Sequence, residues 1–372
     1  MKLHKKNISS DLFLFMGIIT TLIVCGLLFI YSSSSIYALE RFGVAHYFLK
    51  KQCIGLMIGL CALLVAYCIP VKIIHATTPL LFLSSLLLSA LTMIPFLTHR
   101  INGSSRWLSL GGFTFQPSEL LKVTFIVYVA YLIEKKQYTT HSFMHSYLPF
   151  LIILGVTNII LLKQPDFGLA VTLTITTFLL LFIAQYRNKD LLITFASCLP
   201  IVAALIYFKP YRLARVLTFL DPWSDPQGSG FQIIQSLIAI GSGGLWGVGI
   251  SHSKQKFFYL PMQHSDFIFA IIAEETGFIG ALLVIILFIA LLYLGIRIAS
   301  YTTNRFAQFT ILGFIIMINL QAMINIAVTL GLVPTKGIGL PFISYGNSSL
   351  VCTLIMVGLI LNMAQDKHKE YK

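Results

Sequence analysis

Long apolar runs recur along this chain, and they constrain its fold more than any other feature. Several approach about 20 residues, the length that a helix needs to cross about 30 Å of hydrocarbon. Only 10% of the 372 residues are charged, whereas about 25% are charged in a typical soluble domain. Because backbone groups in a bilayer must be satisfied within their own segment, each run is predicted to be a helix. We therefore predict an all-α polytopic membrane protein with a single membrane domain, residues 1–372.

Ten segments are long and apolar enough to be predicted as spanning helices, and an even number places both termini on one side. Lys and Arg are dense in the short segments on that side, which the positive-inside rule assigns to the cytoplasm. A long loop, about 209–267, is then structured and extracytoplasmic, and no nucleic-acid partner is expected. The predicted spans are approximately 11–31, 52–69, 73–97, 119–133, 147–162, 168–185, 190–208, 268–296, 307–330 and 346–364.

The outward loops hold most of the Gly, Pro, Trp and charge that a helical bundle does not need for packing. Irregular backbone near a membrane is tolerated where it is buried in protein or lines a wet cavity. A functional site is therefore predicted at the outer end. The chain contains no Walker A, GxGxxG, GxSxG or HExxH pattern, so nucleotide hydrolysis is not expected. It has no Cys/His cluster with ligand spacing, and no metal site built from the protein is expected.

The loop at 98–118 and the helix after it carry three candidates. Arg106 is either a substrate ligand or a contact with lipid headgroups. Glu119 and Lys122 are three residues apart, so they share a helix face and can pair. A charged pair inside a membrane helix should face the bundle or a cavity, where it supports a site or only packs. Asp166 opens a later span, as a helix cap or as a site residue.

The long loop and the last outward loop carry further cations. Arg212 and Arg215 lie at i,i+3 on a predicted helix. They either face water or bind phosphate, for which the planar guanidinium is well shaped. Lys336 stands alone between two prolines and among glycines, as an anchor at the membrane surface or as a ligand for an anion.

Asp266 lies at the mouth of an apolar helix, in the stretch YLPMQHSDFIFAIIAEE. A carboxylate at a wet junction of loop and helix can stay ionised yet be partly desolvated, which makes it a better base. The alternative is a plain helix cap beside His264. Glu274 and Glu275 point about 100° apart on the helix, so at most one is expected to line the same cavity as Asp266.

Five long motifs, in this order, resemble the SEDS family of shape, elongation, division and sporulation proteins. Within the family, the chain resembles the division branch more than the elongation branch, on the evidence of SKQKFFYLP and DPWSDPQGSGFQ. The motifs are NGSSRWLSLGGFTFQPSELLK, QPDFG, FLDPWSDPQGSGFQIIQSLIAIGSGGLWGVGI, QKFFYLPMQHSDFIFAIIAEE and GLVPTKGIGLPFISYGNSS.

The resemblance implies a ten-helix glycosyltransferase of the bacterial inner membrane, acting at the division septum. It would polymerise lipid II, a disaccharide-pentapeptide on undecaprenyl diphosphate, into glycan strands. Its implied partners are a class B penicillin-binding protein and other division-complex membrane proteins. The catalytic carboxylate of the family falls on Asp266. Where the family pattern has glutamate and threonine this chain has Met262 and Ser265, and the glycine pair of the last loop is Gly346-Asn347.

In this interpretation Asp266 is the general base, and Glu119 and Lys122 support the site. The departing diphosphate needs stabilisation by cations or by a divalent metal such as Mg²⁺ or Mn²⁺. Two other functions stay open, a lipid II flippase and a non-catalytic scaffold for cell division. The residues expected to bind substrate are Arg106, Arg212, Arg215, Lys336, His264 and Ser265.

Overall fold

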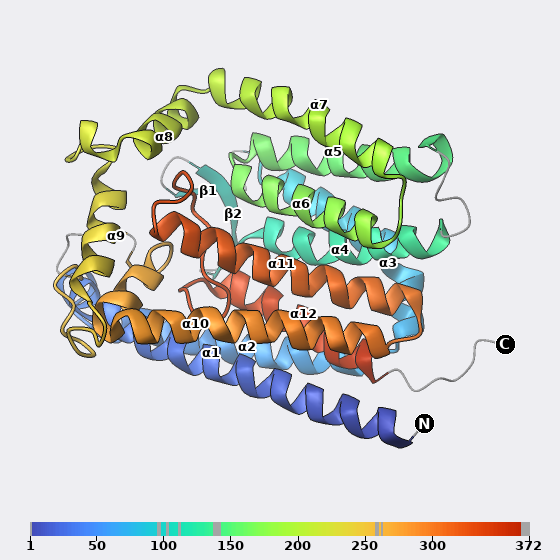
Figure 1. Ribbon diagram of the computed structural model, residues 1–372, viewed down its shortest axis with the longest axis horizontal. Helices are drawn as coiled ribbons and strands as arrows, with labels where there is room; N and C mark the ends of the chain where they lie inside the picture. Colours follow the sequence, from blue (N-terminus) through green and yellow to red (C-terminus); the bar gives the residue numbers. More distant parts are fainter. Residues whose placement is uncertain are drawn as a thin grey trace.

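Helices run roughly side by side through most of the molecule, and each predicted span overlaps one of them (Figure 1). The structure is a computed structural model, and it describes residues 2–94, 98–101, 104–110, 113–136, 143–256, 260–261 and 263–365. The span predicted at 73–97 is shorter than expected, because its helix ends at Leu91, and residues 95–97 lie outside the described residues. The predicted all-α, polytopic membrane fold is confirmed. The spans correspond to α1 (Lys2–Phe42), α2 (Tyr47–Cys68), α3 (Val71–Leu91), α4 (Pro117–Lys135), α5 (Leu148–Lys163), α6 (Phe167–Ile183), α7 (Asn188–Tyr207), α10 (Ile268–Tyr301), α11 (Arg305–Thr329) and α12 (Asn347–Ala364).

Eight helices in the described residues are long and apolar enough to cross a membrane. The other two predicted spans are shorter or more polar. α6 has 17 residues, whereas a π-helical turn, Phe143–Tyr147, lengthens the α5 span to 21. α4 carries Glu119, Lys122, Glu134 and Lys135 among its 19 residues. The count of ten spans therefore stays a prediction for α4 and α6.

The two ends of the bundle differ in structure. α1 begins and α12 ends at the same end, the right side of Figure 1. The opposite end, called here the loop end, carries the strands, α8 (Pro210–Leu220), a short 3₁₀ helix (Pro222–Ser224) and α9 (Phe231–Ser242). This arrangement agrees with termini on one side and a long structured loop on the other. The assignment of the loop end to the outside stays a prediction.

A small sheet at the loop end was not predicted. β1 (Thr98–Ile101), β2 (Ser104–Leu110) and β3 (Phe113–Phe115) form an antiparallel sheet in the order β1-β2-β3. Thr98 pairs with Leu108, and Leu108 pairs with Phe115. A signal for it exists in the sequence, because NG and GG pairs between short alternating runs are typical of hairpins.

α11 lies inside the bundle and contacts α4, α6, α10 and α12. α2 and α12 approach each other closely beside it. A Cβ at Gly59 would lie 2.5 Å from Leu354 Cδ1, and one at Gly358 would lie 2.4 Å from Leu63 O. Small residues allow such close backbone approach between membrane helices. This packing brings the start of α12 next to α2 at the loop end.

α10 is broken at Gly277, where φ is 68° and ψ is −168°. The glycine-rich segment 244–249 of the long loop packs into the break. This segment forms hydrogen bonds with the backbone N–H and C=O groups that lose their helical partners at the break. Without such partners, these groups would be costly to bury in lipid. The hydrogen bonds are Val248 N to Glu274 O at 3.0 Å, Gly249 N to Glu275 O at 3.1 Å, Phe278 N to Gly244 O at 2.8 Å and Ile279 N to Leu245 O at 3.3 Å.

We predict that Gly277→Ala destabilises the protein. The backbone of Gly277 is in the left-handed region, and an added Cβ would lie 2.4 Å from Gly247 N. Strain of this kind costs about 1–3 kcal/mol. Thermal unfolding in detergent measures the effect. Gly155→Ala in α5 is the matched control, because nothing lies within 4 Å of its Cβ position. Equal melting temperatures for the two variants would contradict the role assigned to the break.

Candidate active site

Asp266 lies at the loop end, two residues before α10 begins at Ile268. Phe267 occupies the N-cap position of α10, and no side chain caps the helix there. The alternative in which Asp266 serves as a plain helix cap is therefore not realised. Its backbone carbonyl accepts a hydrogen bond from Asn325 Nδ2 of α11 at 2.8 Å, which leaves the carboxylate available for chemistry.

The carboxylate of Asp266 is half-buried. Burial raises its pKa to about 6, although the positive charges of Arg106 and Arg215 act in the opposite direction. The group is thus mostly ionised at neutral pH and more basic than an exposed aspartate. This agrees with the expectation of an ionised, partly desolvated base.

The loop at 331–346 lies against Asp266. A Cβ at Gly337 would lie 3.4 Å from Asp266 Oδ2, so the residue after Lys336 adjoins the carboxylate. Ser344 Oγ donates to Ser265 O at 2.5 Å, and Tyr345 N donates to His264 O at 2.9 Å. These bonds join the two loops along several residues.

Gln52 of α2 fixes the same loop from the other side. Its Nε2 donates to Ser344 O at 3.3 Å, and its Oε1 accepts from Gly346 N at 3.2 Å. α1 also passes close by, because a Cβ at Gly26 would lie 2.6 Å from Phe342 O. The loop that carries Lys336 is therefore held by two helices.

Three of the predicted cations converge in space. The Lys336 Nζ and the Arg212 guanidinium lie 4.9 Å and 5.1 Å from the ring centroid of Phe167, and Arg215 donates to Thr335 O at 3.2 Å. The sequence places Lys336 and the two arginines in different loops, but the structure brings Lys336 and Arg212 to one ring and holds Arg215 against the loop of Lys336. Burial lowers the pKa of Lys336.

Arg212 and Arg215 differ in how their guanidinium groups are used. Arg212 is buried, and it donates to Tyr211 Oη at 2.9 Å and to Leu205 O at 3.0 Å. Part of its role is therefore to hold α8 against the end of α7. Arg215 is exposed, and its guanidinium donates to Thr335 O of the last loop and lies over the ring of Tyr211, so it keeps more donors for a ligand than Arg212 does.

Arg106 in β2 binds the connection between α5 and α6. Its Nε donates to Gln164 O at 3.1 Å, its Nη2 donates to Pro165 O, and its Nη1 lies 3.9 Å from Asp166 Oδ1. The side chain is thus fixed by protein rather than by lipid headgroups. Asp166 is the N-cap of α6, accepting from Leu169 N at 3.3 Å. Burial raises the pKa of Asp166, while Arg106 acts to lower it.

The pair predicted from the spacing of Glu119 and Lys122 is present, with 2.6 Å between Nζ and Oε2. Lys122 is completely buried. Its Nζ also donates to Gln321 Oε1 of α11 at 3.2 Å. The pair therefore faces the bundle, where it ties α4 to α11.

His264 and Ser265 occupy packing positions. His264 lies among the rings of Tyr37, Phe48 and Tyr345, at 4.4 to 5.9 Å between centroids. Burial lowers its pKa to about 4, so the imidazole is neutral at pH 7. Ser265 contributes its carbonyl to Ser344. This geometry adds no support to their predicted roles in substrate binding.

Glu274 and Glu275 are both committed to the long loop. Ser32 Oγ lies 2.6 Å from Glu275 Oε1, and Lys256 Nζ lies 3.7 Å from the same oxygen. Glu274 accepts from Lys254 N at 2.9 Å. The sequence analysis allowed one of them to share a cavity with Asp266, but pairing with the long loop accounts for both.

No cluster of three or more His, Cys, Asp or Glu gathers within the described residues. A divalent cation beside Asp266 would need most of its oxygen ligands from the substrate. Met262, which stands where the family pattern has glutamate, lies outside the described residues.

Three residues that shape this site were not predicted from the sequence, namely Asn325, Gln52 and Phe167. A signal existed for two of them, because a polar side chain within an apolar span is a candidate for function. Phe167 gave no signal, since an aromatic residue at the start of a membrane helix is common.

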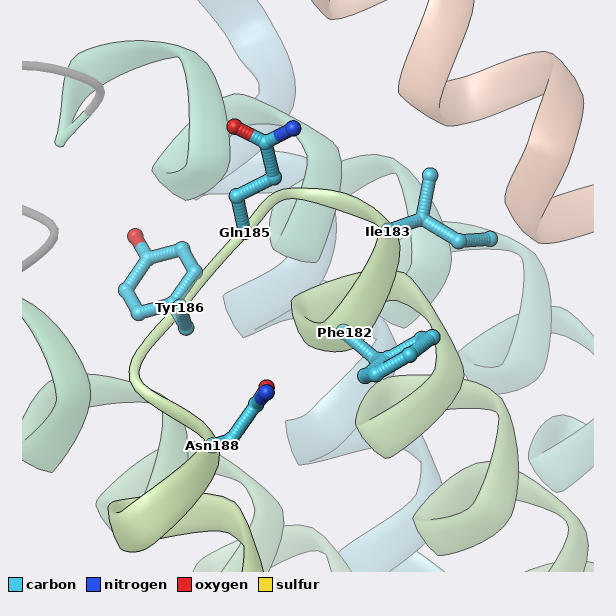
Figure 2. Close-up of a pocket in the computed structure, with 5 residues that line it drawn as sticks. All are labelled: Phe182, Ile183, Gln185, Tyr186 and Asn188. Atoms are coloured by element: carbon cyan, nitrogen blue, oxygen red, sulfur yellow. The ribbon is translucent and has the colours of Figure 1, made fainter.

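A hollow of about 450 Å³ lies at the opposite end of the bundle, where α6 leads into α7. Figure 2 shows its lining by Phe182, Ile183, Gln185, Tyr186 and Asn188. These residues bring together no charged groups, and they lie far along α6 from Asp166 and the loop end. The hollow is therefore not part of the candidate active site.

The family model of the FtsW, RodA and SpoVE cell cycle proteins matches residues 12–369. The chain belongs to this family. It is 41% identical over 339 residues to the probable peptidoglycan glycosyltransferase FtsW of Geobacter sp. (strain M18), covering 91% of this chain and 92% of that protein. It is 40% identical over 360 residues to stage V sporulation protein E of Bacillus subtilis, covering 97% and 98%.

Solved structures of the same family have the same fold. One chain, from a structure described as "Structural coordination of polymerization and crosslinking by a peptidoglycan synthase complex", superposes with a TM-score of 0.79 at 29% identity. It covers 96% of this chain and 98% of that one. RodA of Thermus thermophilus superposes with a TM-score of 0.70 at 25% identity, covering 96% and 97%. The predicted membership of the SEDS family, with division proteins among the relatives, is confirmed.

We predict that exchanging the charges of Glu119 and Lys122 restores part of what either single exchange loses. Breaking a buried pair by changing one partner costs about 3–5 kcal/mol, because an uncompensated charge is left behind. Gln321 can turn its amide to donate to a carboxylate at position 122. Melting temperature and activity are measured for Glu119→Lys, Lys122→Glu and the double variant. A double variant no better than the sum of the singles would remove the coupling.

Proposed function

We propose that this chain is a peptidoglycan glycosyltransferase that polymerises lipid II into glycan strands at the outer surface of the bacterial inner membrane. One observation carries the proposal. A carboxylate with a pKa of about 6, Asp266, lies beside the loop of Lys336, and Lys336 shares one aromatic ring with Arg212. A base next to a cluster of cations suits transfer from a diphosphate-linked sugar. Relatives at about 40% identity that are named peptidoglycan glycosyltransferase support this function.

Asp266 acts as the general base. Its carboxylate takes the proton from the 4-hydroxyl of the acceptor sugar while that oxygen attacks the anomeric carbon of the donor. The new glycosidic bond forms as the bond from the anomeric carbon to the diphosphate oxygen breaks. A positioned base of this kind contributes about 10²–10⁴-fold to the rate. His264 is neutral at pH 7 and adds no charge next to this base.

The cations serve the leaving group. Undecaprenyl diphosphate departs with the electron pair of the broken bond, so negative charge grows on its oxygens. Lys336 and Arg215 face that charge from the two loops, with Arg212 behind them on α8. Fixed cations aimed at developing charge are usually a large term in catalysis. Arg106 adds positive charge near Asp266 from β2, where the α5–α6 connection holds its side chain.

The partner and the location follow from the family. A class B penicillin-binding protein would crosslink the strands that this chain makes, at the division septum and among other division-complex membrane proteins. The similar structure described as a peptidoglycan synthase complex supports a partner of that kind.

A lipid II flippase needs charges along a path through the membrane. In the described residues, the charged groups lie in two sets, one at each end of the helix bundle. Asp11–Arg297 and His75–Glu134 lie toward the end that carries the termini. The groups around Asp266 and Lys336 lie at the loop end. This distribution favours the enzyme over the flippase.

We predict that Asp266→Ala abolishes polymerisation by purified protein supplied with labelled lipid II, a loss of at least about 10²-fold. The base must be ionised, so wild-type activity should be full above the raised pKa and should fall as pH drops through about 6. Glycan ladders on a gel measure both effects, with and without the crosslinking partner.

Asp190→Asn is the matched control for Asp266, because Asp190 lies in the first turn of α7 at the opposite end. It should polymerise normally. Normal ladders from Asp266→Ala would sink the assignment of the base. A wild-type protein that makes no strands under any condition would refute the proposed function itself.

We predict that Arg215→Lys raises KM for lipid II by about tenfold, the equivalent of about 1.4 kcal/mol. Lysine keeps the charge but loses the planar fork that binds phosphate oxygens in pairs. Arg215 is the cleaner test, because Arg212→Lys would also lose the bonds to Tyr211 and Leu205.

Lys209→Ala is the control for this cluster. Lys209 is exposed at the N-cap of α8, and an exposed substitution of this kind should change KM by no more than about twofold. If Arg215→Lys matches the wild type in rate and KM, Arg215 is not a bidentate ligand, and Lys336 remains as the candidate.

A further inference from the structure

Asn325 links the two loops that form the candidate active site. Its side chain lies on α11 and is almost completely buried. The amide nitrogen donates to Asp266 O at 2.8 Å and to Ile338 O at 2.7 Å. Both partners are carbonyl oxygens, which only accept, so the orientation of the amide is determined by its surroundings. One amide group therefore uses its two hydrogens on two different loops.

The two carbonyls belong to residues at or near the proposed base, Asp266, and the proposed cation, Lys336. One belongs to Asp266 itself. The other belongs to Ile338, whose N–H donates to Lys336 O at 3.0 Å. Asn325 is thus part of a short series of hydrogen bonds that connects Asp266, the proposed base, to Lys336, the proposed cation. No charged or reacting group of Asn325 is involved, so its contribution is geometric.

α11 is a suitable support for such a link. It lies inside the bundle and packs against α4, α6, α10 and α12, and its end also contacts α9. One turn before Asn325, Gln321 accepts from the buried Lys122. Residues four apart share a helix face, so one face of α11 holds both the charged pair of α4 and the two loops. Sites held by buried side chains on rigid helices are more precise than sites held by loops alone.

We propose that Asn325 is a positioning residue that sets the separation of Asp266 and the Lys336 loop by donating to both. This inference rests on the proposed function. The misplacement of a catalytic group by about 1 Å can cost about 10²-fold in rate. Loss of the two donors should therefore reduce the rate of transfer more than the binding of lipid II, because the cations themselves remain.

The test compares Asn325→Leu, Asn325→Asp and Asn325→Gln with the wild type. Leucine has a similar size and no donor, aspartate places oxygens against the two carbonyls, and glutamine keeps both donors. Polymerisation of fluorescently labelled lipid II gives kcat and KM, and thermal unfolding gives stability. We expect kcat to fall by about 10- to 100-fold for Leu and Asp with little change in KM, and by less for Gln.

Asn319→Leu is the matched control. Asn319 is on the same helix and also buried, but among the described residues its amide donates to Ile315 O of its own helix, at 3.0 Å, and to neither loop. It should lose stability to a similar degree and keep kcat within about twofold of the wild type.

Three results would overturn the inference. They are equal losses of kcat in Asn325→Leu and Asn319→Leu, a loss confined to KM, or an Asn325→Gln protein that folds and is as slow as Asn325→Leu. If Asn325→Leu and Asn325→Asp fail to fold, the comparison of Asn325→Gln with Asn319→Leu decides. Glutamine moves the two donors by one methylene, so the inference expects its kcat to fall by about threefold to tenfold, whereas a purely structural role predicts kcat within about twofold of the wild type for both variants. An inactive wild type would instead refute the proposed function.

Discussion

Backbone polar groups that lack partners are costly in a bilayer, and the loop end of this protein is built around that constraint. The break at Gly277 frees carbonyl and amide groups of α10, and segment 244–249 takes them up. The loop that carries Lys336 has no regular structure, and Gln52, Ser344 and Asn325 take up several of its backbone groups. Each loop is thus satisfied by a helix or by another loop. The candidate site exists because these irregular segments need one another.

The sequence was sufficient for the helices and for one polar contact. The apolar runs predicted the elements because spanning segments must be helical, and the i,i+3 spacing of Glu119 and Lys122 predicted their pair. It was insufficient where contacts join distant segments. Nothing local indicates that Arg212 and Lys336 meet on Phe167, since such a meeting depends on how α6, α8 and the last loop pack. The break in α10 was missed for a similar reason, because a glycine within an apolar run is also common in unbroken membrane helices.

Neighbouring ionisable groups acquire different properties from burial at this site. His264 and Asp266 are two residues apart, and each is driven toward its neutral form. For the histidine, burial lowers the pKa to about 4, which removes its charge at pH 7. For the aspartate, burial raises the pKa to about 6 while Arg106 and Arg215 limit the rise. The same physical cause therefore leaves one group neutral and the other ionised but more basic. Differences of this kind separate a packing residue from a base.

The polar face of α11 connects parts of the site that the sequence keeps far apart. Gln321 and Asn325 are one turn apart on the same face; Gln321 accepts from Lys122 of α4, and Asn325 donates to the two loops. A buried amide without a partner would cost about 1–3 kcal/mol, so each contact restricts where its partner can lie. A shift of α4 that displaced Lys122 would act on α11 first. It would reach Asp266 and the Lys336 loop through Asn325, because both loops take their position from the same helix face.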